Sequence, residues 1–230
     1  MINQLRVENS KLLRFKALYA IVLVMVAMSV FAGLQKWPGS TDSLYYVFSD
    51  TIQDVSLFFL IALFASWFVG SDFSDRTINR EIVTGCSRWS VVITRLLPSF
   101  CGSAMIHICY VGANCLAFAV KAKDFSGFSM ADVAWSVVVL LQIFALQSIF
   151  VLITFVFHNV FAAITASTIV EVIMCNIMRN FVSADIYKYS CFHLADSADA
   201  TNLMGCGIAA VITIVVVVTI TCVIFNKKDI

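Results

Sequence analysis

Long apolar runs separated by short polar segments dominate the chain. Six runs approach or exceed the roughly 20 residues that a helix needs to cross about 30 Å of hydrocarbon. They are residues 17–34, 52–70, 96–120, 133–157, 160–178 and 204–225. Lipid offers no partner for backbone N–H and C=O groups, so each run should be helical. The runs show no alternation of period two, which excludes a transmembrane β-barrel. The pattern predicts an all-α integral membrane protein with six transmembrane helices.

One polar island, residues 71–90, interrupts two of these runs. Its apolar residues recur at about helical spacing, and its Gly85 stands where the residue after a helix end is often glycine. We therefore expect a short amphipathic helix with Asp75 and Arg76 in its first turn. Its apolar residues are Phe73, Ile78, Ile82 and Val83. Ser87 can then cap the next helix, which carries Arg88, Trp89 and Arg95 toward the membrane surface. The alternative is a solvated interfacial loop anchored by Trp89.

Composition supports the membrane class. Apolar residues make up 61% of the chain, charged residues 13%, and the mean hydropathy is +0.94. The apolar fraction and the hydropathy exceed those of soluble globular domains, and the charged fraction is lower. No segment outside the runs is long enough to bury a core of its own, so residues 1–230 should form a single six-span domain.

Basic residues give the orientation. With the N-terminus in the cytoplasm, the inner side holds ten of them and the outer side five, as the positive-inside rule requires. The inner ten are Arg6, Lys11, Arg14, Lys16, Arg76, Arg80, Arg88, Arg95, Lys227 and Lys228, and the outer five are Lys36, Lys121, Lys123, Arg179 and Lys188. An even number of spans places both termini in the cytoplasm. A cleaved signal peptide is the alternative for the N-terminus, but its apolar run exceeds the usual 7–15 residues.

Motifs for chemistry are missing from the sequence. It contains no GxxxxGK[ST], HExxH or GxSxG pattern. We expect no enzyme activity, catalytic residue, metal site or cofactor on this chain, so energy-consuming work would require another chain. The net charge of +1 argues against a nucleic-acid partner. Most of the eight cysteines fall in apolar spans, but Cys191 and Cys206 share the outer side, which leaves a disulfide between them open.

Three polar residues lie close to the middle of their spans: His107, Gln142 and Glu171. An ionisable residue inside the membrane is a functional hypothesis by default, so these three are candidates for a translocation path. Glu171 either lines a cavity or gate, or packs between helices, protonated or hydrogen-bonded to His107 or a neighbouring span. The sequence leaves both alternatives open.

The segment DFSDRTINREIVTGCSR, residues 72–88, resembles the central motif of type-2 ABC exporter permeases. The likeness is to the small permeases of bacitracin-resistance, lantibiotic-immunity and cytolytic-peptide export systems. Matching positions are Arg76, Ile78, Asn79, Ile82, Val83, Gly85, Ser87 and Arg88, while Thr77 and Arg80 shift the usual arginine–asparagine order. An N-terminal segment, about residues 3–16, resembles that family's interfacial helix before the first span. The closing FNKKDI resembles its basic C-terminus.

The resemblance implies a permease that docks a cytoplasmic ABC ATPase subunit through a coupling helix within residues 71–90. The residues expected to bind that partner are Phe73, Asp75, Arg76, Ile78, Arg80, Glu81, Ile82, Gly85, Ser87 and Arg88. ATP and Mg²⁺ would be held by the ATPase, and a second permease copy or paralogue would complete a dimer. The expected cargo is an amphipathic or antimicrobial peptide, and the expected location is a bacterial plasma membrane. Alternatives are an exporter of lipid, drug or glycan, or a membrane immunity or assembly protein that does not transport.

Overall fold

A computed structural model describes residues 2–35, 44–52, 54, 56–122, 130–194 and 203–227. Every regular element in these ranges is a helix. The elements are α1 (Ile2–Arg14), α2 (Lys16–Gln35), α3 (Leu44–Ile52), α4 (Ser56–Ser74), α5 (Thr77–Val83), α6 (Arg88–Ala122), α7 (Met130–Phe157), α8 (Val160–Phe181), α9 (Ala184–Tyr187) and α10 (Leu203–Lys227). Six of them, α2, α4, α6, α7, α8 and α10, are long and apolar enough to cross a membrane. The predicted all-α, six-span architecture is confirmed.

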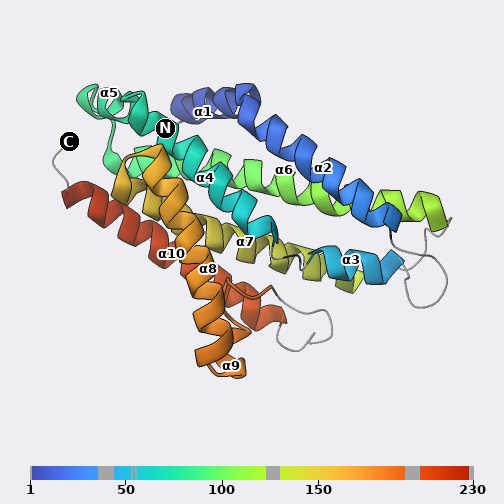
Figure 1. Ribbon diagram of the computed structural model, residues 1–230. Coiled ribbons are helices and arrows are strands. Elements are labelled where there is room, and N and C mark those ends of the chain that lie inside the picture. The colour runs from blue at the N-terminus through green and yellow to red at the C-terminus, as the bar shows by residue number, and fades with distance from the viewer. Residues whose placement is uncertain are drawn as a thin grey trace.

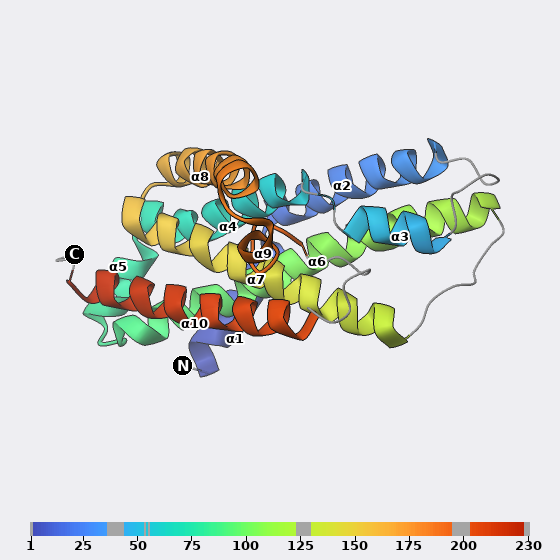
Figure 2. The same ribbon diagram turned by 90° about the horizontal axis from the view of Figure 1, so that it is seen from below.

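The polar elements gather at one end of the bundle. Figure 1 shows α1, α5 and the C-terminal end of α10 together at this end, whereas α3 lies toward the other end. The view from below shows α7 and α10 side by side, with α8 on the opposite flank of α7 (Figure 2). The far end of α8 and the short α9 project away from the other helices (Figure 1). We call the end that holds α1 and α5 the α5 end.

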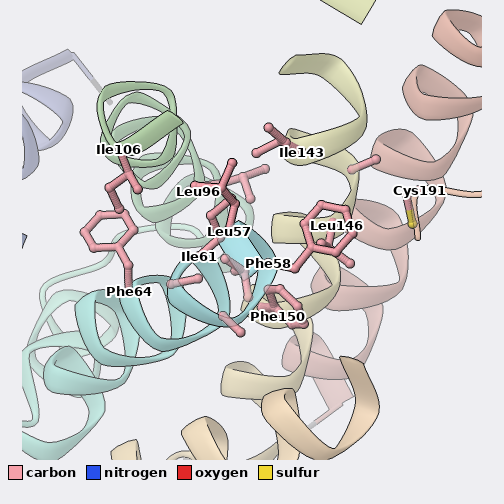
Figure 3. Packing of buried hydrophobic residues seen from close by; sticks show 14 of the residues in the cluster. Leu57, Phe58, Ile61, Phe64, Leu96, Ile106, Ile143, Leu146, Phe150 and Cys191 are labelled. Carbon is pink, nitrogen blue, oxygen red and sulfur yellow. The ribbon is translucent and has the colours of Figure 1, made fainter. Parts of the chain in front are cut away.

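The apolar core is centred on α4, which contacts α2, α6, α7 and α8. Its side chains Leu57, Phe58, Ile61 and Phe64 are fully buried. They meet apolar residues of α6 and α7, as Figure 3 shows. In contrast, large apolar side chains on α2, α8 and α10 remain exposed, as a lipid-facing surface requires.

Helices α2 and α6 pack in parallel and approach each other closely. The buried face of α2 repeats every three or four residues through Leu18, Ile21, Met25, Ser29 and Gly33. Ser29 Oγ donates a hydrogen bond to a backbone carbonyl of α6, at 2.5 Å. A Cβ atom at Gly33 would lie 2.7 Å from the carbonyl oxygen of Asn114. Small residues four apart thus bring the two backbones together, as they do in many transmembrane pairs.

Several predicted boundaries are wrong. The second span does not begin at Ile52, because that residue ends α3 and α4 starts at Ser56. The helix of the third span starts at Arg88, directly after Ser87, as the predicted serine cap requires. Phe73 belongs to the end of α4, and Asp75 and Arg76 form a turn before α5 rather than its first turn.

The close α2–α6 contact makes a stability prediction. Gly33→Ala should lower the free energy of unfolding by about 1–3 kcal/mol, because the added methyl group meets a backbone oxygen that cannot move freely. Gly112→Ala on α6 is the matched control, since a Cβ there meets nothing within 4 Å. Thermal unfolding of the purified protein in detergent measures both. Equal melting temperatures for the two variants would contradict the packing described.

Candidate functional site

The short helix α5 is closed at its C-terminal end by recognisable backbone geometry. At its C-terminal end, the N–H of Gly85 donates to the carbonyl of Ile82 and the N–H of Cys86 donates to that of Glu81, both at 3.0 Å. This pair of bonds is a Schellman motif, and Gly85 supplies its left-handed residue with φ of 91°. Ser87 Oγ then accepts from the N–H of Ser90 at 3.3 Å, which caps α6. The predicted glycine stop and serine cap are confirmed.

Beneath α5 lies a buried charge cluster made of Glu8, Lys11, Asp72, Glu81 and Arg95. The guanidinium of Arg95 on α6 is completely buried and donates two hydrogen bonds to the carboxylate of Glu81 on α5, at 2.6 and 2.8 Å. Its other carboxylate neighbours are Asp72 at 3.3 Å and Glu8 at 3.4 Å. Lys11 of α1 approaches Asp72 at 2.5 Å. One buried cation therefore joins α1, α4, α5 and α6.

The cluster holds three carboxyl groups against two cations. Glu8 has the longest ion-pair distances of the three, at 3.4 Å to Arg95 and 3.9 Å to Lys11. Burial raises the pKa of Glu8 above its ordinary value, and the neighbouring Asp72 and Glu81 add to this, while Arg95 and Lys11 oppose it. When Glu8 is protonated, two negative charges face two positive ones. The bidentate Arg95–Glu81 pair is the strongest attachment of α5 to the spans.

Arg88 attaches the segment 72–88 to the C-terminal end of α10. Its Nη1 donates to the backbone carbonyls of Phe225 and Asn226 at 2.6 and 2.9 Å. A cation at this position satisfies carbonyls at the C-terminal end of α10 and favours the helix dipole. Gln4 of α1 also bonds to the connection, accepting from Ser90 Oγ at 2.9 Å. These bonds hold the segment between α5 and α6 to both ends of the chain.

The outer surface of this segment is exposed. Arg76, Arg80 and Val83 face away from the bundle, and Val83 is 86% exposed. Arg76 adopts a left-handed conformation with φ of 56°, which favours glycine and is uncommon for a residue with a side chain. The exposed members of the predicted partner-binding set are Asp75, Arg76, Arg80, Gly85 and Ser87, joined by Val83. We call these six residues the α5 surface.

The remaining predicted partner-binding residues are buried or half-buried against the bundle. Ile78 is completely buried, and Ile82 packs against the core. Phe73 lies edge-on to Phe155 with ring centroids 5.1 Å apart. Together with Glu81 and Arg88, these side chains attach the segment to the bundle. The predicted set thus divides into an attached half and an exposed half.

The three intramembrane candidates occupy different surroundings. His107 on α6 lines a cavity with residues of α3 and α7, and neither Gln142 nor Glu171 belongs to its wall. Gln142 on α7 donates to the backbone carbonyl of His193 at 3.0 Å. Glu171 lies on the buried face of α8 that also holds Ser167, whose hydroxyl pairs with that of Ser66 on α4 at 2.9 Å. The three residues therefore do not share the wall of that cavity, and the translocation path stays a prediction.

The alternative pairing of Glu171 with His107 is not seen either. Within the described residues, Glu171 Oε2 and His107 Nδ1 each lack a hydrogen-bond partner. Cys191 and Cys206 are both buried and do not form a disulfide with each other, and Cys206 Sγ donates to the Lys188 carbonyl at 3.3 Å. Among the described residues, no group of three or more acidic, histidine or cysteine side chains could hold a metal ion.

The buried charge cluster itself was missed from the sequence. Arg95 was expected at the membrane surface, and Glu81 at the rim of a partner contact. A usable signal existed, because Glu8 and Lys11 stand three apart on α1, and Asp72 and Arg95 flank the polar island at the ends of two spans. Charges at the ends of apolar runs can pair across helices instead of facing water.

Comparisons of the chain with protein-family models, curated proteins and solved structures found no match. The physical features of the α5 end therefore have to support any functional interpretation.

Two carboxyl-to-amide changes test the roles within the cluster. Glu81→Gln should lower the melting temperature at pH 7.5, because it removes the charge to which Arg95 donates two hydrogen bonds. The expected loss in the free energy of unfolding is about 2 kcal/mol. Glu8→Gln should leave the melting temperature unchanged or raise it, since burial disfavours the ionised form of Glu8.

The pH dependence gives the second readout. Because the folded-state pKa of Glu8 is raised, its contribution to stability is fully present below the ordinary value of 4.5 and is lost as pH rises through the folded-state value. Any increase in the melting temperature of Glu8→Gln relative to wild type should therefore be larger at neutral pH than at acidic pH. Melting curves in detergent across this range measure it. A loss at neutral pH as large as that of Glu81→Gln would show that Glu8 is needed as an anion.

Proposed function

We propose that this chain is the membrane-spanning subunit of an ATP-binding-cassette exporter. The observation that carries the proposal is α5, a short helix with an exposed basic and apolar surface, joined to α1, α4 and α6 through the buried charge cluster. A subunit without an ATP-binding motif needs such a rigid projection to receive work from a soluble partner. The resemblance of residues 72–88 to the coupling segment of type-2 exporter permeases supports the same interpretation.

The attachment explains how movement would be transmitted. A force on Arg76, Arg80 or Val83 reaches α6 through the Glu81–Arg95 pair and α10 through Arg88. It reaches α4 directly, because only the turn at Asp75 and Arg76 separates α4 from α5. Closure of two ATPase subunits on ATP and Mg²⁺ would thus shift several spans together. The exposed arginines suit an acidic rim on the partner, and Val83 suits a small apolar pocket.

The cargo and the assembly are parts of the same proposal. An amphipathic or antimicrobial peptide follows from the resemblance, whereas a lipid, drug or glycan would use the same coupling. A second permease copy or paralogue would pair with the chain in the bacterial plasma membrane. A membrane immunity or assembly protein that binds without transport would not require an ATPase at the α5 surface.

A photocrosslinking experiment tests the coupling role. A photoreactive amino acid at Val83, in cells of the native host, should crosslink to a protein whose peptides include a Walker A sequence. The same amino acid at Tyr19, an exposed residue of the α2 span, is the control and should capture none. Arg80→Glu should reduce ATP hydrolysis by the purified complex severalfold while leaving the melting temperature of the permease unchanged, because Arg80 is exposed. Crosslinking at Val83 without any ATPase product would remove the proposed function.

A labelling experiment tests the orientation. Ser183→Cys, exposed beyond the end of α8, should react with an impermeant maleimide added to intact cells. Ser74→Cys, exposed at the α5 end, should react only after the membrane is opened. The wild-type protein is the blank. The reverse pattern would place the α5 end outside and contradict docking of a cytoplasmic ATPase.

A further inference from the structure

A cavity of about 370 Å³ lies between α3, α6 and α7, away from the α5 end. Its volume falls within the roughly 300–1,000 Å³ of small-molecule sites in proteins. The wall is apolar apart from two side chains, His107 and Ser136. Ser136 Oγ already donates to the backbone carbonyl of Asp132 at 2.7 Å. His107 is thus the principal polar group available to a molecule in the cavity.

His107 is 95% buried, and it occupies a position roughly halfway along α6. Among the described residues, its Nδ1 has no hydrogen-bond partner. A buried polar atom without a partner is costly, so a ligand that pairs with it gains a favourable contact. Among the described residues, no charged one belongs to the cavity wall, so a charged ligand group would find no counter-charge there.

The cavity also opens toward the lipid-facing surface of the bundle. Ile108, Val133 and Val137 belong to its wall and are 61%, 57% and 53% exposed. Other wall residues, such as Ile52 and His107, are buried. The cavity is therefore a groove that leads from the lipid side of the spans to an unpaired imidazole. A ligand dissolved in the membrane could enter without crossing water.

We propose that this groove binds an uncharged membrane amphiphile, an apolar chain whose hydroxyl group pairs with His107. A neutral imidazole has one donor and one acceptor nitrogen, and a hydroxyl group can serve either. The apolar wall accommodates the chain, and the single polar side chain fixes its position. This site is separate from the α5 surface, so the inference does not rest on the proposed transport activity.

Photolabelling in lipid nanodiscs tests the site. The probe is a long-chain alkanol with a mid-chain diazirine, and its comparison is the same diazirine alkane without the hydroxyl group. The alkanol should label peptides of α3, α6 and α7 around Phe48, Val111 and Val137 roughly threefold to tenfold more than the alkane does. His107→Phe should remove that preference, because the ring keeps its bulk but loses both nitrogens. Equal labelling by the two probes, or an unchanged preference in His107→Phe, would overturn the proposal.

A second variant guards against misfolding of the first. Gly112 lies in the wall, and a Cβ there meets nothing within 4 Å, so Gly112→Leu should fill the groove without disturbing the helices. It should abolish labelling of the groove by both probes at an unchanged melting temperature. Thr219→Val, on the exposed face of α10, is the matched control and should label as wild type does. Persistent groove labelling in folded Gly112→Leu would mean that the probe lies elsewhere and would refute the site.

Discussion

The guanidinium of Arg95 is completely enclosed, and a cation cannot be enclosed without anions placed around it. The anions come from three other elements: Glu8 from α1, Asp72 from the end of α4 and Glu81 from α5. This requirement determines where each of those elements lies. The N-terminal helix has to fold back against α6, and the polar island has to turn toward the spans. Removal of the Glu81 carboxyl group would leave α6 in the bundle through its apolar face, but α5 would lose its strongest attachment.

The two ends of the bundle are held by different forces. At the α5 end, the contacts between segments are ionic or go to backbone carbonyls, as Arg88 does with Phe225 and Asn226. Toward the other end, neutral hydrogen bonds and apolar packing prevail, as in the bond from Gln142 to the His193 carbonyl and the burial of Cys191 and Phe192. Ionic contacts with bidentate geometry fix orientation more strictly than apolar packing does. The bidentate Glu81–Arg95 pair therefore fixes the orientation of α5 on α6.

The features that depend on a single helix could be predicted from the sequence. The six spans, the serine cap at Ser87 and the glycine at Gly85 follow from local composition, and the structure confirms them. It did not predict the break between α3 and α4, where no proline or glycine marks the boundary. Nor did it predict the partners of Arg95, which lie 14, 23 and 87 positions away, at Glu81, Asp72 and Glu8. Whether a charge near the end of a span faces water or another helix depends on how the helices pack.

The division of the polar island into attached and exposed halves links the physics to the proposed role. Ile78, Glu81 and Arg88 are committed to contacts within the chain, so they cannot bind a partner without first weakening the attachment. Arg76, Arg80 and Val83 are exposed instead, and the attached residues of the same segment hold them in place. A projection that transmits force needs both properties together. A merely solvated loop would need neither the buried charge cluster nor the Schellman motif that ends α5.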